Sequence, residues 1–170
     1  MTSLEAPVLA RLDALGIAYT VHRHPAVYTV EAAKVLRGDV GAAHAKNLFL
    51  RDKREQMWLL TVLEDRPVDF RALREVLDTR GTPSFGSPER LRTWLGVTPG
   101  SVTPLAAIND TGCGVRVVLD AALRDYPLVG VHPNHNEATV TLAPADLVRF
   151  LESTGHPPTW LEGTAGTGAP

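Results

Sequence analysis

The strongest constraint on the fold is a pair of apolar segments, residues 47–51 and 56–63, joined by the charged residues 52–55. Apolar, β-rich segments separated by a short polar turn are typical of an antiparallel hairpin. The first segment contains Leu48, Phe49 and Leu50 in succession, which indicates a strand buried on both faces. The sequence therefore predicts a hairpin that lies inside a larger sheet.

Alternating apolar residues and turn signals predict the other elements. Further strands are expected at residues 17–24, 104–109, 115–120, 126–131 and 138–142. Helical spacing and capping residues predict helices at residues 4–15, 30–38, 70–77, 88–95 and 144–155. Because strands outnumber helices and tight turns join most neighbours, we expect an α+β fold. It would have a mixed, largely antiparallel sheet, able to curl into a partial barrel, with helices packed around it.

Composition limits the class of protein. A chain of 170 residues suits one domain, here residues 1–155, followed by a Pro-, Gly- and Thr-rich tail, residues 156–170, expected to be flexible. The net charge of −2 argues against coating nucleic acid by bulk electrostatics, although it permits a few phosphate contacts. No apolar run approaches the roughly 18 residues that span a membrane, and the N-terminus lacks a secretion pattern. The single cysteine, Cys113, excludes an internal disulfide and fits a reducing cytoplasm.

The stretch GVHPNHNE, residues 130–137, raises the question of a metal site. His132 and His135 have HxxH spacing, and Glu137 follows two residues later. A zinc site needs a third and usually a fourth ligand, and cysteine is nearly absent, so the pattern disfavours zinc. For residues 135–137 we favour a solvated turn.

His132 is expected at the end of a strand, between Gly130 and Pro133. Glycine lets the backbone approach a ligand closely, and proline fixes the direction in which the chain leaves. This placement can present an imidazole to a pocket. From these residues alone, a histidine hydrogen-bonded within the hairpin is an equally good interpretation.

Lys46 and Asn47 open the buried strand. Lysine occurs only at Lys34, Lys46 and Lys53, so each one is a candidate functional group. A lysine held by a rigid strand can meet a phosphate or a polarised carbonyl, and an asparagine amide both donates and accepts hydrogen bonds. The more common interpretation is a lysine whose ammonium reaches solvent at a strand end. The sequence contains no P-loop, GxGxxG or GxSxG motif, so residue chemistry alone leads to a pocket with Lys46, Asn47 and His132.

Several blocks of sequence resemble the prolyl-tRNA editing family. These blocks are HPAVYTVEAA, AKNLFLRD, WLLTV, GVTPGSVTPLAAIND and GVHPN…ATVTL, and they cover about residues 5–155 in order. The family contains free-standing aminoacyl-tRNA deacylases, related to the editing insertion of bacterial prolyl-tRNA synthetases and to the Cys-tRNA(Pro) deacylases. The chain looks most like the branch that removes alanine from tRNA(Pro).

The resemblance implies hydrolysis, without a metal or other cofactor, of the ester that joins a mischarged amino acid to the terminal adenosine of tRNA(Pro). It implies that Lys46 contacts the terminal phosphate or the ester carbonyl, that Asn47 holds the adenosine or aminoacyl end, and that His132 orients the ester or the attacking water. The remaining site residues that it implies are Gly100 and Ser101 beside the ester, Gly130 opposite them, and Tyr28, Thr29 and Glu31 in the wall of the amino-acid pocket.

Several alternatives stay open at this point. The substrate can instead be Cys-tRNA(Pro) or another small aminoacyl-tRNA. The chain can also be an unrelated small-molecule hydrolase, or a module that binds tRNA or a synthetase without catalysis. The expected partners are the acceptor end of tRNA(Pro) and, as a further candidate, prolyl-tRNA synthetase, with no membrane. We expect weak, salt-sensitive contacts to the acceptor stem from Arg51, Lys53 and Arg54.

Overall fold

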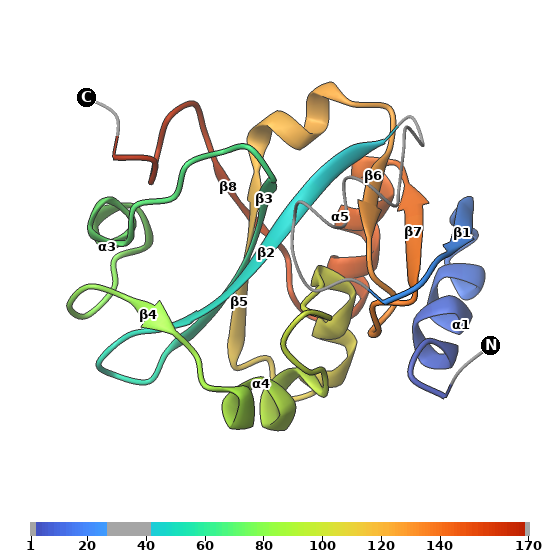
Figure 1. The fold of residues 1–170 in the computed structure, drawn as a ribbon, viewed down its shortest axis with the longest axis horizontal. Helices are drawn as coiled ribbons and strands as arrows, with labels where there is room; N and C mark the ends of the chain where they lie inside the picture. The colour runs from blue at the N-terminus through green and yellow to red at the C-terminus, as the bar shows by residue number, and fades with distance from the viewer. Residues whose placement is uncertain (1–2, 27–41, 169–170) are drawn as a thin grey trace.

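Strand β2 (Ala43–Arg51), the longest described strand, organises the sheet (Figure 1). The computed structural model describes residues 3–26 and 42–168. Within them, β2 pairs along one edge with β3 (Met57–Leu63), and this pair is the antiparallel hairpin expected from the sequence. On its other edge β2 pairs with β6 (Val129–Val131) and with β4 (Ser84–Phe85).

The whole sheet has eight strands in the order β1-β7-β6-β2-β3-β5-β8, with β4 beside β2. The strands not yet given are β1 (Tyr19–Arg23), β5 (Val115–Asp120), β7 (Ala138–Leu142) and β8 (Thr159–Leu161). Three pairings are parallel, β2 with β6, β3 with β5 and β5 with β8, and the others are antiparallel. The predicted α+β class with a mixed sheet is confirmed. The strand order ends at β1 and β8, so the sheet stays open and does not close into a barrel.

The described helices are α1 (Ala6–Ala14), α3 (Phe70–Leu77), α4 (Pro88–Leu95) and α5 (Pro144–Ser153), with two short 3-10 helices, η1 (Pro104–Asn109) and η2 (Ala121–Asp125). Side chains cap two of these helices: Asp69 accepts from Ala72 N before α3, and Ser87 accepts from Arg90 N before α4. The helix predicted at residues 30–38 lies outside the described residues. Among those described, no helix has the length and apolar character needed to cross a membrane.

Residues 104–109 correct one prediction, because they form η1 and not a strand. Thr103 starts this turn by accepting a hydrogen bond from Leu105 N, and Pro104 follows at the first helical position. A short apolar run bounded by turn residues fits a buried strand and a buried helical turn equally well. The sequence pattern therefore could not separate the two.

The sheet has an apolar core on each face. One core joins β2, β3, β5, β6 and β7 to α1, α4, α5 and η1. The other core joins the opposite side of β2, β3, β5 and β8 to α3. Alternate residues of β2 separate between them, since Phe49 belongs to the first core and Leu48 and Leu50 to the second. This burial on both faces is what the apolar run in β2 predicted.

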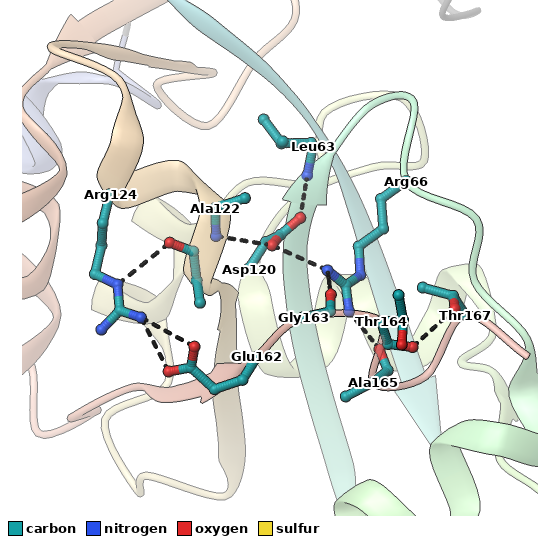
Figure 2. A network of polar contacts seen from close by, with 11 residues as sticks. Leu63, Arg66, Asp120, Ala122, Arg124, Glu162, Gly163, Thr164, Ala165 and Thr167 are labelled. Atoms are coloured by element: carbon teal, nitrogen blue, oxygen red, sulfur yellow. Dashed lines mark hydrogen bonds and ion pairs between the residues drawn. The ribbon is translucent and has the colours of Figure 1, made fainter. Parts of the chain in front are cut away.

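The C-terminal segment is tied to the sheet by a buried ion pair (Figure 2). Arg66 Nη1 lies 3.1 Å from Asp120 Oδ1, and the two side chains are 9% and 1% exposed. Arg66 also donates to the main-chain oxygens of Gly163 and Ala165. Asp120 accepts in addition from Leu63 N at the end of β3. One carboxylate therefore joins the ends of β3 and β5 to the chain after β8.

The described part of the segment expected to be a flexible tail, residues 156–170, is attached in this way. His156 is buried, with its Nε2 2.9 Å from Asp110 Oδ2, and Leu161 is buried in the second core. Further along, Asp69 N donates to Gly166 O. The Pro/Gly-rich composition suggested mobility, but these anchors depend on residues far away in the sequence.

The N-terminal part of the chain is tied to the sheet by a second buried carboxylate. Glu5, which is fully buried, accepts from Arg23 Nη1 and Nη2 at 2.8 and 2.9 Å and lies 2.8 Å from His135 Nε2. These hydrogen bonds raise the pKa of Arg23. Asn134 also donates to Leu4 O. The cluster holds the loop that joins β6 to β7, residues 132–137, against the start of α1.

The expectation of a solvated turn at residues 135–137 was therefore wrong for two of the three residues. The side chain of His135 is 12% exposed and Asn136 is buried, and only Glu137 is exposed. His135 Nδ1 accepts from Glu137 N, so a neutral ring carries its proton on Nε2 and donates it to Glu5. The polar residues of this loop are structural partners of the N-terminal helix.

We predict that Asp120→Ala lowers the free energy of unfolding by about 3–5 kcal/mol, because it leaves Arg66 buried without its partner. Chemical denaturation measures this change. Glu162→Ala is the matched control, since it removes an exposed carboxylate that pairs with Arg124 in the same region (Figure 2), and we expect a loss of about 1 kcal/mol or less. Equal losses in the two variants would contradict the role given to Asp120.

We predict that Glu5→Ala destabilises the protein by about 1–3 kcal/mol, since the buried His135 Nε2 loses its acceptor. Asp13→Ala is the control: it removes an exposed carboxylate from the same helix, and its effect should stay within about 0.5 kcal/mol. Denaturation curves of the two variants give the comparison. A loss for Glu5→Ala no larger than that of the control would show that the cluster does not fasten the loop.

Candidate functional site

One edge of β2 is divided between two short partner strands. Ala43 and His44 pair with β6, and Leu50 and Arg51 pair with β4. The backbone bonds on this edge include Ala43 N to Leu128 O and Gly86 N to Phe49 O. Between them, residues 45–49 have no strand partner on this edge within the described part of the chain. The strands β2 and β6 thus run parallel for two residues and then separate.

A small cavity lies where β2 and β6 separate. Its volume is about 30 Å³, above the roughly 10–15 Å³ that one water molecule needs. The lining residues come from β2, from the end of β6 and from β7: His44, Ala45, Asn47, Gly130, Val131, His132 and Thr139. Three residues implied by the family resemblance, Asn47, Gly130 and His132, are therefore brought together although 85 positions separate the first from the last.

Asn47 has a defined orientation in this cavity. Its register partner across the β2–β3 pair is Thr61, and Thr61 Oγ1 donates to Asn47 Oδ1 at 2.7 Å. The amide nitrogen Nδ2 makes no hydrogen bond to any described residue. Asn47 can therefore offer two N–H donors to a bound group.

His132 has a defined tautomer. Its Nδ1 lies 3.0 Å from the main-chain oxygen of Ala138, which can only accept, so a neutral His132 carries its proton on Nδ1. The other nitrogen, Nε2, is then an acceptor. The backbone of His132 is fixed as well, because Thr103 Oγ1 donates to His132 O at 2.6 Å. Both interpretations of this residue hold together: it is hydrogen-bonded within the hairpin, and it lines a cavity.

Lys46 lies between two lining residues but leaves β2 on the other face from Asn47. Its register partner is Val62, and Val62 belongs to the core under α3. Lys46 shares a face with His44, and His44 is level with Gly130 of β6. The lysine is half-buried and makes no hydrogen bond or ion pair with a described residue. The structure thus places Lys46 beside the cavity, on the face that carries His44 and Gly130.

The face of the sheet that carries Gly130 also holds polar residues that sequence reasoning missed. His24 Nε2 lies 2.8 Å from Thr139 Oγ1, and the rings of His24 and His132 are 6.4 Å apart. His44 and Thr139 line the cavity. Histidine at alternate positions, His22 in β1 and His24 just after it, was the available signal, but the strand that would face them could not be identified from the sequence.

The other residues implied by the resemblance are placed as follows. Gly100 has a φ of 89°, and Ser101 is buried, but neither lines this cavity. Their loop reaches the site through Thr103. Tyr28, Thr29 and Glu31 lie outside the described residues. Within residues 3–26 and 42–168, no group of three or more His, Cys, Asp or Glu side chains is arranged to hold a metal ion.

Comparisons with known proteins identify relatives of this chain. A family model described as the aminoacyl-tRNA editing domain matches residues 24–150. The prolyl-tRNA editing protein ProX of Acetoanaerobium sticklandii is 37% identical over 150 residues, which cover 88% of this chain and 91% of that protein. The Xenopus laevis protein named prolyl-tRNA synthetase associated domain-containing protein 1 is 39% identical over 159 residues, 91% of this chain and 94% of that protein.

The fold recurs in a solved structure described as that of a candidate trans-editing enzyme for prolyl-tRNA synthetase. The TM-score is 0.71 at 20% identity, and the match covers 96% of this chain and 99% of that one. The family model spans both Asn47 and His132, and the relatives cover the domain nearly end to end. This chain belongs to the aminoacyl-tRNA editing domain family.

Proposed function

We propose that this protein is a trans-editing hydrolase that removes a mischarged amino acid, preferentially alanine, from tRNA(Pro). The main observation in support is the cavity between β2 and β6, which has the amide of Asn47 as a donor on one wall and the imidazole of His132 as an acceptor on another. The names of the relatives, a prolyl-tRNA editing protein and a prolyl-tRNA synthetase associated domain, support tRNA(Pro) as the substrate. The same names make prolyl-tRNA synthetase a proposed partner.

The proposed reaction is hydrolysis of the aminoacyl ester without a metal. An ester is already activated, so positioning and stabilisation of the developing oxyanion supply most of what the protein must add. Asn47 Nδ2 donates to the carbonyl oxygen as it becomes negative. His132 Nε2 accepts a hydrogen bond from the attacking water or from a ribose hydroxyl that orients it. The water oxygen bonds to the carbonyl carbon, and the bond from that carbon to the ribose oxygen then breaks. The proton that the water loses passes to the ribose oxygen, so the products are the free amino acid and a ribose hydroxyl.

Lys46 is proposed to bind the terminal phosphate of the tRNA. Of the two roles that the family resemblance left open, phosphate or ester carbonyl, the phosphate fits better, because Lys46 and Asn47 leave β2 on opposite faces. An ammonium with no described partner is suited to a phosphate as a point charge. The substrate would then cross the edge of β2, with its phosphate and its ester on either side.

The size of the cavity supports alanine as the preferred amino acid. A cavity with a volume of about 30 Å³ favours a small side chain, such as a methyl group, over the larger ring of proline. Exclusion of a larger side chain by a rigid wall is an effective form of selection, whereas rejection of a smaller one gives only about 1–3 kcal/mol per methylene. Glycine and serine are therefore expected to react in part, and cysteine is the nearest competitor.

The far end of β2 offers cations for the acceptor stem. Lys53, Arg54 and Arg80 are exposed there, on two turns that contact each other. Asp52 holds the turns together by accepting from Arg80 N, Gln56 N and Arg54 N. Burial raises the pKa of Asp52, but these hydrogen bonds outweigh it and leave the pKa below its ordinary value. Residue 51 is about 13 Å from residue 47 along an extended strand, so these cations would meet phosphates farther from the 3′ end, in the acceptor stem.

We predict that Asn47→Ala and His132→Ala each slow the deacylation of Ala-tRNA(Pro) by about 100-fold or more, the usual effect of losing an oxyanion donor or a group that positions a proton. Lys46→Ala, which loses the proposed phosphate contact, should instead raise the protein concentration needed for half-saturation. The measurement is release of amino acid from tRNA(Pro) charged with alanine, cysteine, serine or proline, at saturating protein. The wild-type protein should release alanine fastest and proline slowest.

Arg149→Ala is the control for Lys46→Ala, since it removes one exposed cation from α5 and should keep the wild-type rate and half-saturation. Melting curves check that each variant is folded. Faster release of cysteine than of alanine would identify Cys-tRNA(Pro) as the preferred substrate. Cleavage of simple esters as fast as charged tRNA would indicate a small-molecule hydrolase, and binding without release would indicate a non-catalytic module.

We predict that Lys53→Ala and Arg80→Ala weaken tRNA binding and leave the rate at saturation unchanged. Loss of one phosphate contact should lower the slope of log affinity against log salt concentration by about 0.7–0.9. Titrations at several salt concentrations give the slope, with Arg149→Ala as the control that keeps it. A wild-type slope in both variants would place the acceptor stem elsewhere.

A further inference from the structure

We propose that Thr61 is a positioning residue, whose buried hydroxyl fixes the Asn47 amide with Nδ2 facing the substrate. This inference rests on the proposed function and adds a residue to the proposed site. Thr61 is fully buried in β3 and does not line the cavity, so it would act only through Asn47. It carries the one hydroxyl in the strand, whose other six residues are apolar.

The direction of the hydrogen bond follows from the surroundings of Thr61. Its hydroxyl lies 2.7 Å from Asn47 Oδ1 and has no other described hydrogen-bond partner. If the amide were turned by half a rotation, Nδ2 would face the hydroxyl, and the hydroxyl proton would have no acceptor in a buried place. An unsatisfied buried donor is strongly disfavoured. Thr61 therefore selects the orientation in which Asn47 presents its N–H groups.

The selected orientation matters for the reaction. A carbonyl oxygen that gains negative charge is stabilised by an N–H donor and repelled by the lone pairs of an amide oxygen. With the amide turned, Asn47 would present Oδ1 to the oxyanion, and the wall opposite His132 would change from donor to acceptor. The amide of an asparagine is nearly symmetric in shape, so packing alone cannot prevent this rotation. The hydroxyl of Thr61 can.

Threonine and valine have nearly the same shape, which permits a sharp test. Thr61→Val removes the hydroxyl and keeps the packing, and Thr61→Ser keeps the hydroxyl and removes a methyl group. Thr79→Val is the matched control, because Thr79 is also buried and its hydroxyl donates to Gly81 O, at the far end of the β2–β3 hairpin. The measurement is the single-turnover rate of Ala-tRNA(Pro) deacylation at saturating protein, together with the half-saturating concentration.

We expect Thr61→Val to lower the rate about tenfold or more with little change in half-saturation, and Thr61→Ser to stay within about threefold of wild type. Thr79→Val should match wild type. In an Asn47→Ala background, Thr61→Val should have no further effect, since the two residues act as one unit. A wild-type rate in Thr61→Val, an equal loss in Thr61→Ser, or losses that multiply in the double variant would overturn the proposal.

A measurement without substrate separates this inference from the proposed function. In the ¹⁵N–¹H spectrum, the Asn47 side-chain NH₂ signals are identified by their absence from Asn47→Ala. They should shift in Thr61→Val and keep their positions in Thr61→Ser. If wild type releases no amino acid, the proposed function fails, and these signals still decide the role of Thr61. Unshifted signals in Thr61→Val would overturn it.

Discussion

The site depends on how one edge of β2 is paired, because short strands pair with its two ends and no described strand pairs with its centre. Strand β2 is nine residues long, and on the edge away from β3 the described strands β6 and β4 each pair with two of its residues, one pair near each end. Its centre is held by β3 on the other edge and by apolar cores on both faces, so the strand stays extended where no described strand pairs with this edge. The backbone and side chains beside the gap are therefore fixed before a substrate arrives. A polar site on rigid strands keeps its geometry better than one on loops.

The wall of the cavity that contains His132 needs more support than the wall formed by β2. His132 is located just after β6, where sheet bonds no longer hold the chain. Thr103 binds its carbonyl from one side, and the Glu5 cluster holds the next few residues from the other. Both partners are fully buried, and each comes from a segment distant in sequence. The loop is thus shaped by long-range polar bonds, which explains why the residues after His132 are buried although their composition suggests a solvent-exposed turn.

The sequence identified most elements because their signals are local. Local signals include the helix caps Asp69 and Ser87 and the charged turn at residues 52–55. Each lies within a few residues of the helix or strand whose end it marks. The candidate pair of Asn47 and His132 came from residue chemistry and family resemblance, and their meeting depends on a parallel pairing that no local pattern encodes. Thr61 had no signal at all, since a threonine in an apolar strand is ordinary. Its importance appears only when the cross-strand register is known.

The chemistry assigned to the site explains why strongly reactive residues are not needed. Cleavage of an activated ester requires a hydrogen-bond donor where negative charge develops and a hydrogen-bond acceptor near the attacking oxygen. Asparagine and neutral histidine can each present either polarity, so their identity alone does not define the site. Thr61 fixes the first and the carbonyl of Ala138 fixes the second. In the proposed reaction, these two hydrogen bonds select the orientation of the Asn47 amide and the tautomer of a neutral His132.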